Sequence, residues 1–196
     1  MLLSLPNLLT YLRIVLIPLL VIAYYLPYRY AHVLAMSIFI LAAITDWLDG
    51  YLARKLDQMS RFGAFLDPVA DKLMVAAALV LLVSDANVHA QVLDTRLFSM
   101  VVLVIIGREI AVSALREWMA EAGKRSSVAV SIIGKLKTVS QMVAIPFLLL
   151  DQPILGVDVF TLGEGLLYLA AGLTLWSMII YLRAAWPTLV RSGPGQ

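Results

Sequence analysis

Cysteine is absent from the chain, so the sequence excludes disulfide bonds and thiolate metal ligands. Charged residues are also scarce: they make up 14% of the chain, against about 25% in an ordinary soluble domain. The net charge is only +2 and no aromatic-basic pattern is present, so nucleic-acid binding is not expected. What is abundant is hydrophobic residues, at 62%, and this composition favours a membrane protein.

Six apolar stretches approach the roughly 20 residues that a helix needs to cross a bilayer. They cover residues 8–27, 31–52, 66–84, 96–116, 132–150 and 162–186. The links between them are short, and no basic segment precedes the first stretch as it does in a signal peptide. We therefore predict one all-α polytopic membrane domain over residues 1–196, with about six transmembrane helices around a polar cavity that faces the cytoplasm.

Links rich in basic residues alternate with links that have few of them, and this asymmetry indicates the orientation of the chain in the membrane. One side would carry only Arg29 and Arg96. The other would carry Arg54, Lys55, Arg61, Lys72, Arg108, Arg116, Lys124, Arg125, Lys135, Lys137, Arg183 and Arg191. Because basic residues favour the cytoplasmic side of membrane proteins, both termini are predicted to be cytoplasmic.

Four aspartates flank the polar link between the second and third apolar stretches. Asp46 and Asp49 are three residues apart, so they share one face of a helix, and Asp67 and Asp71, four residues apart, do likewise. A short link makes the two helices antiparallel neighbours, so both acidic faces are expected to converge. Four carboxylates would then surround one small space.

The negative charge of such a cluster requires compensation by cations, because each aspartate within a bilayer costs about 2.5 to 3.5 kcal/mol on insertion scales. Hard divalent cations prefer carboxylate oxygens, and two ions can share four aspartates. Paired metals that bridge phosphate oxygens are typical of phosphoryl transfer. The aspartates therefore predict two divalent cations, Mg²⁺ or Mn²⁺, and a phosphate-containing substrate.

Plainer interpretations exist for single residues of this stretch. Asp67 precedes Pro68, a pairing typical of a helix N-cap followed by proline at the first helical position. Glycines in membrane helices often serve packing alone. The complete spacing is Asp-x2-Asp-Gly-x2-Ala-Arg-x8-Gly-x3-Asp-x3-Asp, from Asp46 to Asp71. A chance match at all of its fixed positions is expected only about 10⁻⁸ times in a chain of this length.

This spacing resembles the signature of the CDP-alcohol phosphatidyltransferase family at every fixed position. Further segments resemble the bacterial branch of the family that uses sn-glycerol 3-phosphate as acceptor. They are residues 6–10 with Arg13, 107–110, 113–118 and 134–138. The resemblance thus extends over most of the chain, and it implies a homodimer of six-helix subunits in the bacterial inner membrane that binds nucleotide on the cytoplasmic side.

The resemblance also implies roles for individual residues. Asp46, Asp49, Asp67 and Asp71 would bind metal, and Asp71 would also act as the general base. Residues at the family's CDP-binding positions are Asp46, Gly50, Ala53, Arg54 and Gly63. The implied reaction transfers the phosphatidyl group of CDP-diacylglycerol to sn-glycerol 3-phosphate, which yields phosphatidylglycerophosphate and CMP.

A phosphorylated acceptor needs cationic partners, and the sequence offers candidates near the cytoplasmic ends of the fourth and fifth spans. They are Arg108, Arg116, Lys135 and Lys137. The positive-inside rule alone would also place basic residues there, and Arg108 with Glu109 is also interpretable as a structural ion pair. On the first span, Asn7, Thr10 and Arg13 recur every three residues, so we expect them to face the polar cavity or the nucleotide.

Three other functions remain open from the sequence. The same chemistry with serine or inositol phosphate as acceptor would keep all four aspartates. A cation transporter also uses intramembrane carboxylates, although such sites generally lie near the bilayer midplane. The third alternative is a non-catalytic lipid-binding subunit.

Overall fold

The computed structural model describes residues 5–56, 61–121 and 132–191, and this part of the chain is helical. The helices are α1 (Leu5–Tyr24), α2 (Ala31–Leu56), α3 (Arg61–Ser84), α4 (Ala86–Gln91), α5 (Thr95–Glu121), α6 (Ile132–Leu150) and α7 (Val159–Arg191). Outside them, the described residues contain one isolated β-bridge, between Ile154 and Val157. The all-α prediction is confirmed.

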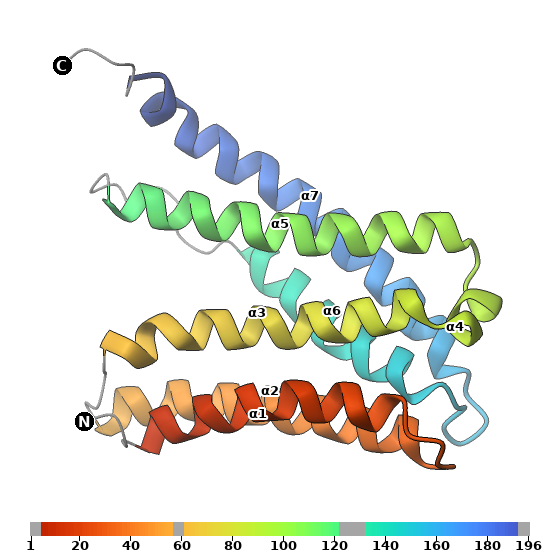
Figure 1. Cartoon of the computed structure of the whole chain (residues 1–196). Helices are drawn as coiled ribbons and strands as arrows, with labels where there is room; N and C mark the ends of the chain where they lie inside the picture. Colours follow the sequence, from red (N-terminus) through yellow and green to blue (C-terminus); the bar gives the residue numbers. More distant parts are fainter. Residues whose placement is uncertain (1–4, 57–60, 122–131, 192–196) are drawn as a thin grey trace.

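The long helices run back and forth along the molecule (Figure 1). α1 begins and α7 ends at one end of the bundle, which we call the terminal end, and α4 lies at the other, the α4 end. α1 packs against α2 and α3. α6 packs against both α2 and α7, and α7 in turn packs against α5. The long helices alternate in direction, so four more helix ends lie toward the terminal end. They are the last residues of α2 and α5 and the first residues of α3 and α6.

Four of the described helices are long and apolar enough to cross a membrane, so the chain is a multi-pass membrane protein. The candidate spans are Asn7–Tyr24, Ala31–Leu52, Thr95–Ala120 and Val159–Trp186. α3 and α6, at 24 and 19 residues, are not among them, and each carries charged residues in the half nearer the terminal end. A total of six spans therefore stays a prediction.

Helix ends differ from the predicted apolar stretches mainly at the terminal end. α2 continues to Leu56, and α3 begins at Arg61, five residues before the predicted span. Polar residues can extend a helix beyond its apolar part, which a hydropathy window does not detect. The short α4 was not predicted: Asp85 caps it by accepting a hydrogen bond from the backbone N–H of Asn87 at 2.8 Å.

The apolar core lies between the helices, and the outer surface is apolar as well. Leu20, Phe39, Leu79, Ile105 and Leu148 are almost fully buried. In contrast, large apolar side chains such as those of Leu103 and Ile110 on α5 are more than 60% exposed. A soluble protein rarely exposes so much contiguous apolar surface, whereas a bilayer is the solvent that such a surface suits.

Gly163 allows the close approach of α6 and α7. A Cβ added there would lie 2.9 Å from the Cβ of Phe147 and 3.1 Å from the carbonyl oxygen of Ala144, both rigid parts of α6. We expect Gly163→Ala to lower the free energy of unfolding by about 1 to 3 kcal/mol through overpacking. Thermal unfolding in detergent measures this, and Gly172→Ala on the same helix is the control, because its added Cβ meets nothing within 4 Å.

Gly172→Ala is expected to be neutral or slightly stabilising, since alanine favours a helix interior over glycine by about 0.5 to 1 kcal/mol. Equal melting temperatures for the two alanine variants would contradict the packing role of Gly163.

Candidate active site

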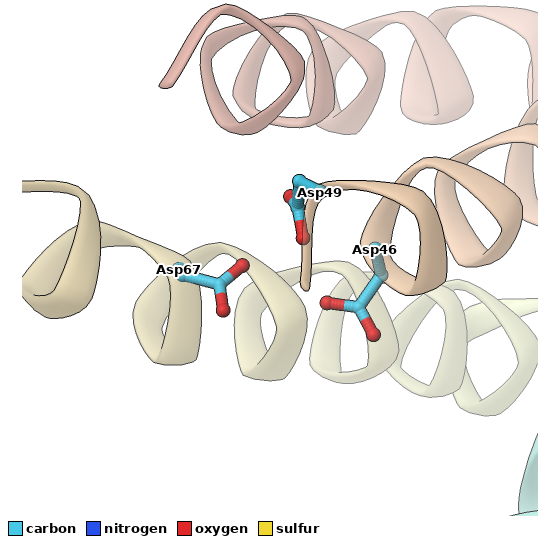
Figure 2. A group of neighbouring side chains, drawn as sticks. All are labelled: Asp46, Asp49 and Asp67. Atoms are coloured by element: carbon cyan, nitrogen blue, oxygen red, sulfur yellow. The ribbon is translucent and has the colours of Figure 1, made fainter. Parts of the chain in front are cut away.

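Three carboxylates converge between α2 and α3. Asp46 and Asp49 lie on α2 and Asp67 lies on α3, and their side chains approach one another (Figure 2). One oxygen from each lies within 4.8 Å of the others. Asp49 is buried, while Asp46 and Asp67 remain partly exposed, so the group is accessible on one side.

Asp67 does not cap a helix, so that interpretation of the Asp67-Pro68 pair is wrong. α3 begins at Arg61, and Pro68 therefore lies inside the helix. Proline in a helix interior removes one backbone hydrogen bond and commonly bends the helix. The position of Asp67, one turn and a half into α3, instead places its carboxylate beside the end of α2.

Arg13 of α1 lies at the centre of the three carboxylates. Its Nη1 is 2.9 Å from Oδ1 of Asp46 and 2.8 Å from Oδ1 of Asp67, and its Nη2 donates to Oδ2 of Asp49. The Arg13 side chain is only 1% exposed. Thr10, one turn earlier on α1, donates from Oγ1 to Oδ2 of Asp49 at 3.5 Å. The predicted cavity-facing side of α1 therefore faces the acidic cluster, with Asn7 buried as well.

Asp71 lies one turn beyond Asp67 on α3 and is not part of the group of three. It lines a small recess of about 60 Å³ between α3, α5 and α6. The other residues of this recess are Lys72, Val75, Glu109, Lys137, Thr138, Gln141 and Met142. The structure thus brings Asp71 together with Lys137, one of the predicted acceptor-binding residues.

The recess combines charges of both signs with an unused hydrogen-bond acceptor. Lys137 is buried and donates from Nζ to Oε1 of Glu109, while Lys72 donates from Nζ to Oγ of Ser113 at 2.8 Å. Gln141 is also buried, and among the described residues its Oε1 accepts no hydrogen bond. Buried polar atoms are nearly always paired, so this Oε1 is an exception among the described residues.

Arg108 and Arg116, the other predicted acceptor-binding residues on α5, both contact α7. The guanidinium carbons lie 5.5 Å and 4.9 Å from the ring centre of Tyr181. Arg108 also donates to Oγ of Ser177 at 2.9 Å and lies 3.3 Å from Oε1 of Glu109. Both arginines therefore have structural partners, and Arg108 reaches the recess through Glu109.

The remaining predicted residues lie at the terminal end or near it. Gly50 is on α2 beside Asp49, and Gly63 is in the first turn of α3. Lys135 is exposed on α6, two residues before the buried Lys137. Ala53 and Arg54 belong to the last turns of α2, but their side chains lie outside the described residues, as do Lys124 and Arg125.

The donor set of Asp46, Asp49 and Asp67 suits hard divalent cations. All of its ligand atoms are carboxylate oxygens, which Mg²⁺ and Mn²⁺ prefer over nitrogen or sulfur. Two of the carboxylates are partly exposed, which leaves room for water or phosphate oxygens as further ligands. The arrangement can therefore hold a phosphate-bound metal beside the recess of Asp71.

Sequence patterns gave a weak signal for some residues of this site. Glu109 was visible only as the neighbour of Arg108, and Gln141 was not identified at all. Glu109 lies on α5 and Gln141 on α6, so their place in the recess depends on how these two helices pack against α3. Tyr181 was also missed, because a tyrosine in an apolar helix resembles ordinary packing.

Comparison with known proteins identifies the family of the chain. The CDP-alcohol phosphatidyltransferase family matches residues 3–176. The chain is 53% identical over 191 residues to a CDP-diacylglycerol–glycerol-3-phosphate 3-phosphatidyltransferase of Pseudomonas fluorescens, covering 97% of this chain and 94% of the relative. Proteins of the same name from Pectobacterium atrosepticum and Yersinia enterocolitica are 53% and 51% identical, over 93% and 96% of this chain and 94% and 98% of theirs.

The family match covers both α2 and α3 with all four signature aspartates, and the relatives match almost from end to end. The chain belongs to the CDP-alcohol phosphatidyltransferase family.

Proposed function

We propose that this protein transfers the phosphatidyl group of CDP-diacylglycerol to sn-glycerol 3-phosphate, which produces phosphatidylglycerophosphate and CMP. The names and near-complete coverage of the relatives support this reaction. The structural observation that carries it is the juxtaposition of an acidic cluster with a recess that holds Asp71, Lys137 and Gln141. One part suits a metal-bound pyrophosphate, and the other suits a small polar acceptor.

Asp71 acts as the general base in this proposal. It accepts the proton of the primary hydroxyl of sn-glycerol 3-phosphate as that oxygen attacks the lipid-side phosphorus of CDP-diacylglycerol. The new bond joins the acceptor oxygen to this phosphorus, and the bond between the phosphorus and the CMP oxygen breaks. CMP leaves with the electron pair of that bond, and the phosphatidyl group stays on the acceptor.

Lys137 holds the phosphate of the acceptor. Its ammonium group lies in the same recess as Asp71, so an acceptor bound there has its phosphate at a cation and its hydroxyl near a base. Lys137 donates from Nζ to Oε1 of Glu109, which also lines the recess. Gln141 also lines the recess, and its side-chain amide would be a hydrogen-bond partner for the hydroxyls of glycerol phosphate.

Asp46, Asp49 and Asp67, with Asp71 at the edge of the cluster, would hold two divalent cations, Mg²⁺ or Mn²⁺. Bound cations supply positive charge to the pyrophosphate oxygens, where charge develops during transfer. Gly50, Ala53, Arg54 and Gly63 would contact the cytidine diphosphate portion. Small residues allow the nucleotide to approach the helix backbones closely.

The proposed setting is the inner membrane of a bacterium, with the terminal end in the cytoplasm. Basic residues gather near this end: Lys55 on α2, Lys135 on α6 and Arg183 on α7 are all exposed there. CDP-nucleotides and glycerol phosphate are cytoplasmic metabolites, and the acidic cluster lies toward the same end. We also propose a homodimer, from the family resemblance.

The function is tested by measuring CMP release from detergent-purified protein with CDP-diacylglycerol and Mg²⁺ or Mn²⁺. We expect release with sn-glycerol 3-phosphate and none with serine, with inositol phosphate or without an acceptor. CMP release that requires serine or inositol phosphate would support phosphatidyl transfer but contradict sn-glycerol 3-phosphate as the acceptor. Metal-dependent binding without release in any mixture would favour the non-catalytic subunit, and cation flux into liposomes would favour the transporter.

A further inference from the structure

Arg13 is the most buried charged side chain of the acidic cluster, and it contacts all three carboxylates from a third helix. Its Nη1 lies 2.9 Å from Asp46 and 2.8 Å from Asp67, while its Nη2 donates to Asp49. One guanidinium thus links α1 to α2 and to α3. An ordinary buried ion pair needs only one partner for each charge, so this arrangement calls for a different explanation.

Electrostatics supplies that explanation. Three ionised carboxylates with oxygens within 4.8 Å of one another repel strongly, and the burial of Asp49 increases the repulsion. The planar guanidinium offers several N–H groups in a fixed fork and can bond to more than one carboxylate at once. Arg13 neutralises one of the three charges. An excess of two negative charges remains in this group of three for divalent cations to balance.

We infer that Arg13 is the resident cation of the acidic cluster: it holds Asp46, Asp49 and Asp67 together before divalent cations bind. This inference rests on the metal-dependent function proposed above and adds a positioning residue from α1 to it. Arg13 contacts the ligands and not the reacting atoms. Its contribution is largest when no metal is present, and it falls as bound metal takes over the neutralisation of the carboxylates.

The test measures thermal unfolding of detergent-purified protein in EDTA and in saturating Mn²⁺. In EDTA, Arg13→Gln is expected to melt well below the wild type, because three carboxylates are left uncompensated. Mn²⁺ is expected to raise the melting temperature of Arg13→Gln by about 5 °C more than it raises that of the wild type. This difference between the two metal-induced shifts is the quantity that identifies Arg13 as a resident cation.

Arg108→Gln is the matched control. Arg108 is another buried arginine, with Ser177 and Glu109 as partners, and it contacts none of the three carboxylates. We expect its substitution to lower the melting temperature by the same amount in EDTA and in Mn²⁺. If Arg13→Gln does not fold, Arg13→Met takes its place, since methionine also removes the charge but keeps an unbranched, flexible side chain that fills the space. Its metal-induced shift is also expected to exceed that of the wild type.

Two outcomes would overturn the inference and are distinguishable. If the wild type releases CMP and is stabilised by Mn²⁺, but Arg13→Gln or Arg13→Met shows the same metal-induced shift, Arg13 is a packing residue and the function stands. If the wild type neither gains stability with Mn²⁺ nor releases CMP with any acceptor, the proposed function fails together with the role of Arg13.

Discussion

Replacing Asp71 with asparagine is expected to lower the rate of CMP release by about 100- to 10,000-fold, the usual contribution of a general base. Asparagine has nearly the same shape as aspartate but cannot accept a proton at neutral pH. Asp71 lines the recess one helical turn from Asp67, so the substitution leaves Asp46, Asp49 and Asp67 in place. Initial rates with CDP-diacylglycerol and sn-glycerol 3-phosphate measure the effect.

Asp158→Asn is the control for this substitution. Asp158 is exposed before α7, at the α4 end, where it accepts hydrogen bonds from the backbone N–H and the hydroxyl of Thr161. Asparagine caps helices as well as aspartate does, so stability is kept. We expect wild-type rates from Asp158→Asn. A rate above one tenth of the wild type in a folded Asp71→Asn protein would contradict the assignment of Asp71 as the base.

Much of the acidic cluster was predictable because it depends on local spacing. Asp46 and Asp49 are three residues apart on one helix, and a short link brings the next helix alongside. Asp67 joins them for the same reason, as the structure confirms. The all-α class was equally predictable, since long apolar stretches in a bilayer must form helices or closed barrels.

The contribution of α1 was only partly predictable. Thr10 and Arg13 repeat at a helical spacing, which indicated a polar face, but their partners lie more than 30 residues away in the sequence. A single chain carries no signal for which neighbouring helix such a face contacts. The same limit applies to Arg108 and Arg116, because no local pattern predicts their contacts with Tyr181 on α7.

The recess of Asp71 was the least predictable part of the site. Its residues come from α3, α5 and α6, and Gln141 and Glu109 take part only because of the way these helices cross. Sequence reasoning placed Lys135 and Lys137 together as acceptor-binding candidates. They are two residues apart on α6 and so point about 200° apart around the helix, which leaves Lys135 exposed and Lys137 buried.

Because Lys137 is buried in the recess and Lys135 is exposed, substitutions of the two lysines are expected to have different effects on acceptor binding. Lys137→Met is expected to raise KM for sn-glycerol 3-phosphate by about 10- to 100-fold, since a hydrogen bond to a charged group contributes about 1.5 to 3 kcal/mol. KM for CDP-diacylglycerol is expected to stay within about threefold, because the recess lies beside the acidic cluster and not within it. Lys135→Met is the comparison on the same helix and is expected to change KM for glycerol phosphate much less.

A second variant separates acceptor binding from a disturbance of the local ion pair. Lys137→Met leaves Glu109 with Arg108, 3.3 Å away, as its remaining cationic partner among the described residues, and the unbalanced carboxylate would itself repel a phosphate. Adding Glu109→Gln removes that negative charge. If Lys137 binds the acceptor phosphate, KM stays high in the double variant, because the cation is still missing. A return of KM to the wild-type value would instead show that Lys137 only neutralises Glu109, and the acceptor phosphate would then have to be bound by other cations of the terminal end.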